Sequence, residues 1–241
     1  MDTKPINTVP NNLWRHSQQT MPSGTPQHPS LHQPPSGDAQ LSNSEHQQFC
    51  NYLYNVFRAQ VANDPSTVVL SNTRVDWGTA GIAPHTPNLA VIPNIRRPAV
   101  WSTFETLSEG TKPILIVEVT SPDYREVAIV DKFEEYAQVG LQSYVIADSY
   151  NSQGKINRRV LAYELGDRGY EAVPSENQRV WLRAVGLWLG FEGNQLVCYN
   201  AKGQPFLDYI QLVKALSEAE SQLQAEREAR LALESRLSLG H

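Results

Sequence analysis

A strand, a helix and a second strand in succession constrain the fold of this chain most strongly. Residues 113–121 (PILIVEVTS) have a strongly apolar strand pattern, residues 126–140 (EVAIVDKFEEYAQVG) have a helical pattern that ends at Gly140, and residues 143–148 (SYVIAD) form another strand pattern. Two strands joined in this way lie parallel, with a right-handed crossover. We therefore expect a mixed α/β sheet, which residues 158–165 (RRVLAYEL) and later short runs would extend with antiparallel strands.

Three regions differ in composition. Residues 1–43 are rich in Pro, Gln, Ser, Asn and His without periodicity, which is typical of a disordered leader. The body, residues 44–204, is predicted to begin at Ser44 as the cap of a helix over 45–62. Short strand patterns follow at 66–70, 73–77 and 88–93, and we expect them to be consecutive neighbours in the sheet.

The tail, residues 205–241, has high helix propensity. A heptad seam along this helix would contain Leu216, Ala219, Leu223, Leu233 and Leu237. The same heptad frame also places Glu226 and Arg230 at core positions. A solvated helix with i,i+4 ion pairs is an equally good interpretation. Self-association through this helix or through the sheet is therefore one of two open alternatives.

Composition excludes several classes of protein. No segment has the roughly 20 consecutive apolar residues of a membrane span, and the first residues lack a secretory signal, so we expect a soluble cytoplasmic protein without a membrane partner. A net charge of −5 argues against a protein that coats nucleic acid. Cys50 and Cys198 are predicted to be reduced and buried, and we found no dinucleotide, Walker, serine-hydrolase or zinc-protease motif.

Glu118 is the most informative residue, because it interrupts an apolar strand. An unpaired carboxylate buried there would cost several kcal/mol, so Glu118 must meet a cation, hydrogen-bond donors, a metal ion or water. The simple alternative is an ion pair with an arginine. The following helix has an apolar arc formed by Ile129, Val130, Phe133, Tyr136 and Ala137. Lys132 lies at the edge of this arc, from where its ammonium could reach Glu118, although it could also be an ordinary surface lysine. Together the two residues match the needs of phosphodiester hydrolysis, which uses carboxylates to hold Mg²⁺ or Mn²⁺ and a cation to stabilise the attacked phosphate.

The stretch from residue 113 to residue 148, with residues 46–61, 86–93, 158–165 and 185–190, resembles the Uma-type endonucleases of the PD-(D/E)XK superfamily. This resemblance implies a restriction-endonuclease-like fold, DNA as the substrate and Mg²⁺ or Mn²⁺ as the cofactor. It also implies a metal-ligand role for Glu118, with the backbone carbonyl of Val119 as an extra ligand, and a role for Lys132 at the phosphate or the attacking water.

The chain departs from the family pattern at three positions. The expected Pro-Asp dipeptide is Pro87-Asn88, so Asn88 offers a neutral amide oxygen where an anionic ligand is expected. Ala128 replaces an acid one turn before the lysine, and Tyr124 replaces a small hydroxyl residue. Thr120 stands at the superfamily lysine position, as the shift of that lysine to the helix implies.

Another acid could compensate for Asn88, and three are candidates. Asp76 lies on a preceding strand, Asp148 ends the second strand of the unit, and Glu45 opens the first helix. Each has an ordinary interpretation, as a surface acid, a turn residue and a first-turn glutamate, respectively. Trp181 and Trp188 are predicted to be core or edge aromatic residues, and His85 is placed in a loop.

Three functions remain open. The first is a metal-dependent endonuclease with a partly degenerate site formed by Glu118, Lys132 and Asn88. The second is an inactive nuclease-like module that binds nucleic acid or protein, which Asn88 and Ala128 favour. The third is a purely structural protein in which Glu118 is ion-paired far from any cleft.

Overall fold

The computed structural model describes residues 37–121 and 128–239, and the side chains of residues 44–121 and 132–235. The predicted leader therefore lies mostly outside the described residues. The described residues form four helices: α1 (Gly37–Gln60), α2 (Thr106–Glu109), α3 (Ala128–Gln138) and α4 (Tyr209–Leu239). Helix α1 begins at Gly37 rather than near Ser44, and no proline in this segment prevents the earlier start.

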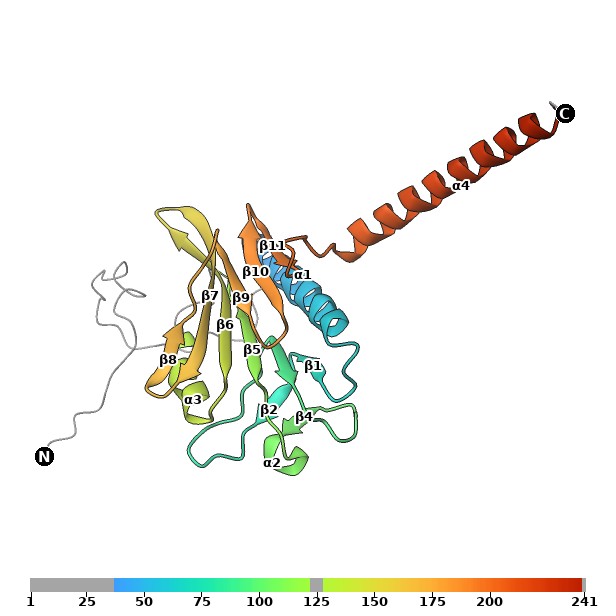
Figure 1. Ribbon diagram of the computed structural model, residues 1–241. Coiled ribbons are helices and arrows are strands. Elements are labelled where there is room, and N and C mark those ends of the chain that lie inside the picture. The colour runs from blue at the N-terminus through green and yellow to red at the C-terminus, as the bar shows by residue number, and fades with distance from the viewer. Residues whose placement is uncertain (1–36, 122–127, 240–241) are drawn as a thin grey trace, which may run out of the picture.

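A six-stranded sheet forms the centre of the molecule (Figure 1). Its strand order is β1-β3-β5-β6-β7-β8, made of β1 (Val68–Ser71), β3 (Leu89–Ile92), β5 (Leu115–Val119), β6 (Ser143–Ser152), β7 (Lys155–Gly166) and β8 (Gly169–Ala172). Strands β5 and β6, which flank α3 in the chain, pair in parallel, and all the other neighbours are antiparallel. The predicted mixed α/β sheet is thus confirmed.

The expected strand pairing was wrong at two places, where the strands form small separate sheets. Strand β2 (Arg74–Asp76) pairs with β4 (Thr103–Glu105) instead of with its sequence neighbours, and β1 pairs directly with β3. Strands β9 (Arg179–Leu182), β10 (Leu187–Glu192) and β11 (Gln195–Tyr199) form a separate three-stranded sheet and do not extend the central one. Hydrophobic alternation predicts that a segment is a strand, but it does not specify the partner of a short strand.

Two hydrophobic clusters cover the two faces of the central sheet. Helix α1 packs on one face, where it meets alternate β5 residues such as Val117 and Val119 together with the three-stranded sheet. Helix α3 belongs to the other face, where Tyr136 packs with Ile116 and Tyr144. All five residues of β5 are buried because both faces are covered, and the predicted buried cysteines, Cys50 and Cys198, lie in the α1-side cluster.

Helix α4 leaves the body at Asp208 and extends away from it (Figure 1). Asp208 and Gln211 form a reciprocal capping box, in which each side chain accepts a hydrogen bond from the backbone N–H of the other. Every described side chain of α4, residues 209–235, is exposed. No described helix is both long and apolar enough to cross a membrane.

Candidate active site

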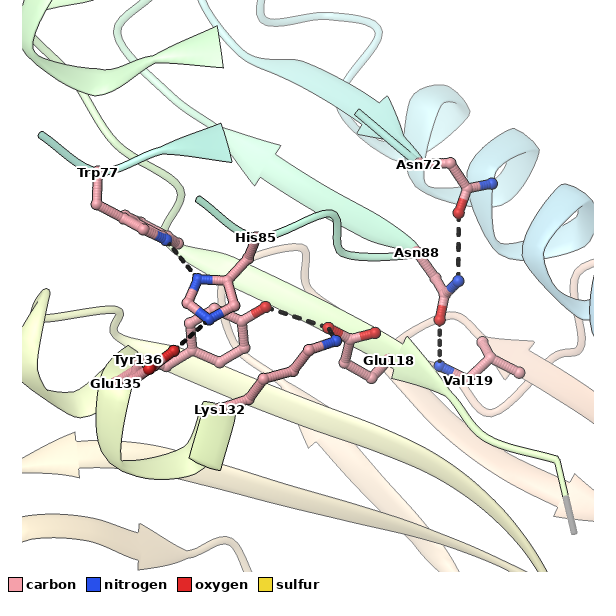
Figure 2. Close-up of polar contacts among 9 residues, drawn as sticks. All are labelled: Asn72, Trp77, His85, Asn88, Glu118, Val119, Lys132, Glu135 and Tyr136. Carbon is pink, nitrogen blue, oxygen red and sulfur yellow. Dashed lines mark hydrogen bonds and ion pairs between the residues drawn. The ribbon is translucent and has the colours of Figure 1, made fainter. Parts of the chain in front are cut away.

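Glu118 lies on β5 and faces α3, with only 7% of its surface exposed. Its Oε1 atom accepts two hydrogen bonds, one from the Lys132 ammonium at 2.9 Å and one from the Tyr136 hydroxyl at 3.1 Å (Figure 2). The Lys132 side chain is itself only 23% exposed, so the ion pair is largely shielded from water. The expected approach of Lys132 to Glu118 is therefore present in the structure.

The position of Lys132 and Tyr136 follows from the geometry of α3. The two residues are separated by four positions, so they lie on the same side of the helix one turn apart. Tyr136 is fully buried, and burial first, with the negative charge of Glu118 second, raises the pKa of its hydroxyl far above the ordinary value. The hydroxyl therefore keeps its proton and acts as a hydrogen-bond donor to Glu118.

The C-terminal end of α3 is fixed close to Tyr136. Gly140 has a φ of 68°, the Leu141 N–H donates to the Tyr136 carbonyl at 3.0 Å, and the Gly140 N–H donates to the Ala137 carbonyl at 3.0 Å. This pattern is a Schellman motif, which satisfies carbonyl groups at a helix end. The Lys112 ammonium donates to the Val139 carbonyl at 2.7 Å and ties the same turn to the segment that precedes β5.

Asn88 lies opposite Glu118 across the β3–β5 ladder. Leu89 pairs with Val117, so extending the antiparallel register by one residue places Asn88 beside Glu118 on the same face. The Asn88 Oδ1 atom accepts a hydrogen bond from the Val119 N–H at 2.8 Å, and its Nδ2 donates to Asn72 Oδ1 at 3.2 Å (Figure 2). The backbone donor at Val119 fixes which end of the amide faces β5.

A second polar chain supports the opposite end of the site. His85 is buried, accepts a hydrogen bond from Trp77 Nε1 at its Nδ1 atom (2.8 Å), and pairs through Nε2 with Glu135 (Figure 2). Because Nδ1 accepts, Nε2 carries the proton that is shared with Glu135. These hydrogen bonds link α3, through Glu135, to the segment that precedes Asn88.

The acids considered as substitutes for Asn88 have other partners. Asp76 caps the Gly78 N–H at 2.9 Å, and Glu45 pairs with Arg158 at 2.7 Å. Asp148 does not begin a turn as expected, because it lies within β6, where it is 2% exposed, accepts from Thr120 at 3.0 Å and pairs with Arg159 at 3.0 Å. No three His, Cys, Asp or Glu side chains within the described part of the chain gather closely enough to hold a metal ion.

The oxygen ligands available for Mg²⁺ are therefore few but of the right chemistry. Glu118 supplies one carboxylate, and the Asn88 amide oxygen keeps a second lone pair besides the one that accepts from Val119. Magnesium sites commonly use one or two carboxylates together with substrate phosphates and water, so this set meets the lower limit of what Mg²⁺ requires.

The sequence predicted four site residues, Glu118, Lys132, Asn88 and Val119, and the structure brings all four together. The sequence pattern did not identify Tyr136 or His85 as polar contributors. Tyr136 was assigned only to the apolar arc of its helix, although its place one turn after Lys132 was a usable signal. Tyr124 lies outside the described residues, and Ala128 is the first residue of α3.

A family model and a solved structure match this chain. A family model described as "Uma2: Putative restriction endonuclease" matches residues 38–194, which is more than half of the chain. A solved structure described as a putative nuclease belonging to DUF820, from Anabaena variabilis ATCC 29413, is 15% identical, covers 58% of this chain and 73% of its own, and has a TM-score of 0.44. No curated protein matches.

Proposed function

The chain belongs to the Uma2 family, whose model is described as a "Putative restriction endonuclease". We propose that it is a metal-dependent DNA endonuclease with a partly degenerate active site. The observation that carries the proposal is the 2.9 Å contact between Glu118 on β5 and Lys132 on α3. This contact holds a buried carboxylate and a largely shielded ammonium together on the face of the sheet that α3 covers.

In the proposed reaction, water is added across one P–O bond of DNA, which gives a phosphate monoester and a free hydroxyl group. Glu118 would hold Mg²⁺ or Mn²⁺, with the Asn88 side-chain oxygen and the Val119 carbonyl as neutral ligands. The metal ion supplies Lewis-acid polarisation of the phosphoryl group when it is bound. Lys132 would donate a hydrogen bond to the phosphate oxygen on which negative charge accumulates.

A plasmid-nicking assay tests this proposal. We expect the native chain to convert supercoiled DNA to the nicked form with Mg²⁺ or Mn²⁺, and not with EDTA. Glu118→Gln keeps the size of the side chain and removes its charge, so it should abolish cleavage. Lys132→Met should lower the cleavage rate by two orders of magnitude or more, because removing one hydrogen-bond donor that stabilises transition-state charge lowers the rate by about 10²-fold or more.

Lys155→Met is the matched control, because it removes a lysine charge from an exposed position on β7, and Lys155 itself forms no ion pair with the described residues. This variant should cleave like the native chain. The proposal fails if native cleavage does not exceed that of Glu118→Gln, or if Lys155→Met lowers the rate as much as Lys132→Met does.

A second candidate function is favoured by Asn88. Its neutral side chain occupies the position where the family pattern has an acid, and its two hydrogen bonds serve to join β5 to Asn72. In this alternative the fold binds DNA or a protein and does not cleave. Binding of DNA in EDTA without any metal-dependent cleavage would favour this function over the first.

A further inference from the structure

Tyr136 and Lys132 share a single oxygen of Glu118, and this arrangement has a consequence for the other oxygen. Both side-chain hydrogen bonds to the carboxylate end on Oε1. No described side chain donates to Oε2. A carboxylate has about four lone-pair positions, so two donors on one oxygen orient the group and leave the second oxygen for a further ligand.

We propose that Tyr136 is a positioning residue that commits Oε1 of Glu118 to α3 and thereby leaves Oε2 as the atom that binds the divalent cation. The inference rests on the proposed function, because it assigns a metal-binding role to Glu118. The family resemblance assigns no role to Tyr136, and the sequence pattern placed this residue only in the apolar arc of its helix. The polar role of Tyr136 is therefore additional to both.

Packing holds the Tyr136 ring in place. Its ring centroid lies 4.8 Å from that of His85, 5.0 Å from that of Tyr144 and 5.8 Å from that of Trp77. Burial on all sides leaves the ring few alternative rotamers, so its hydroxyl is held at a fixed height above the sheet. Hydrogen bonds that orient a metal ligand commonly change metal affinity by 10- to 100-fold when they are removed.

Lys132 alone does not provide the same control. Its flexible side chain carries a rotating ammonium and is 23% exposed, whereas Tyr136 is fully buried and rigid. Tyr136 therefore determines the orientation of the carboxylate, while Lys132 supplies the charge.

The matched control is Tyr144, which belongs to the same aromatic cluster. Tyr144 is also fully buried, but its hydroxyl has no hydrogen-bond partner in the described part of the protein. Tyr136→Phe and Tyr144→Phe each remove one buried hydroxyl from the same face of the sheet. Only the first of them removes a bond to Glu118.

The experiment is Mn²⁺ binding to the full chain without DNA, measured by titration calorimetry, with circular dichroism to check folding. Tyr136→Phe should weaken Mn²⁺ binding by about tenfold, Tyr144→Phe should stay within about twofold of the native value, and Glu118→Gln should abolish binding. If Tyr136→Phe does not fold, Tyr136→His, which returns a ring donor to the position, must bind more tightly than Tyr136→Leu.

The outcomes separate this inference from the proposed function. If Glu118→Gln abolishes binding but Tyr136→Phe binds like Tyr144→Phe, the positioning role is overturned and the metal role of Glu118 stands. If the native chain does not bind Mn²⁺, or if Glu118→Gln binds equally well, both proposals are overturned.

Discussion

At the scale of single residues, the candidate site solves the problem of a carboxylate within an apolar strand. Glu118 is buried because α3 covers its face of the sheet, and α3 also provides the cation and the hydroxyl that compensate for that burial. The same face includes Asn88, whose amide is already bonded to the Val119 N–H. These side chains are therefore already held in place by one another, and Glu118 is the one acid among the proposed metal ligands.

Asn88→Asp should increase metal-dependent function. An aspartate can keep the hydrogen bond from the Val119 N–H, and the neighbouring Asn72 amide can rotate to present its NH₂ to the other carboxylate oxygen. A second anionic ligand should tighten Mn²⁺ binding by about tenfold, in line with the effect of ligand charge on affinity. Mn²⁺ titration of Asn88→Asp and of the native chain measures this change. Asn72→Asp is the control, because it adds the same charge to the hydrogen-bond partner of Asn88 instead of to Asn88 itself. Equal effects of the two variants would contradict the prediction.

Part of this residue-scale arrangement was visible in the sequence. Glu118 stood out because it interrupts the apolar strand over 113–121, and Lys132 lay at the edge of the apolar arc of the next helix, so their contact could be predicted. The partners of Asp148 and Glu45 could not, because Arg159 and Arg158 reach them across sheet and helix contacts that no local pattern encodes. His85 was equally hidden, since its bonds to Trp77 and Glu135 join segments 8 and 50 residues away.

At the scale of elements, the end of α3 is a test of how backbone geometry supports the site. Gly140 has a positive φ of 68°, and a Cβ atom added there would lie 2.8 Å from the Lys112 ammonium nitrogen. Gly140→Ala should therefore destabilise the fold by more than about 1 kcal/mol, because it strains the backbone and displaces Lys112 from the Val139 carbonyl.

Gly154→Ala isolates the backbone contribution. Gly154 has a φ of 77°, but a Cβ atom there would meet nothing within 4 Å. Chemical denaturation should give a larger loss for Gly140→Ala than for Gly154→Ala. A loss of equal size would show that the contact with Lys112 has no measurable effect on stability.

The elements themselves were predicted unevenly. The β5–α3–β6 unit was predicted because long apolar strands and a helix with a glycine end have strong local signals. The pairing of β2 with β4 and the separate β9–β11 sheet were missed, because short strands choose their partners through tertiary packing. The early start of α1 at Gly37 was missed because Ser44 offered a plausible cap inside what is a longer helix.

At the scale of the whole molecule, helix α4 stands apart because it extends away from the body (Figure 1). All its described side chains are exposed, including Ile210, Leu216, Leu223, Leu231 and Leu233. Removing residues 209–241 should therefore leave the thermal unfolding of the body nearly unchanged, because every described side chain among them is exposed.

Removal of α4 should, however, change the association state. Leu216 and Leu223 are exposed and lie one heptad apart on α4, and we propose that two copies pair along the seam that includes them. Sedimentation velocity should show a concentration-dependent dimer for the full chain and a monomer for the truncated chain. Leu216→Gln with Leu223→Gln should reproduce the monomer, whereas Ser217→Gln with Gln224→Ser, which lie outside the seam, should not. A full chain that sediments as a monomer at all concentrations would favour the solvated-helix alternative. In that alternative α4 is stable without a partner helix, and i,i+4 pairs such as that between Arg230 and Glu234 contribute to its stability.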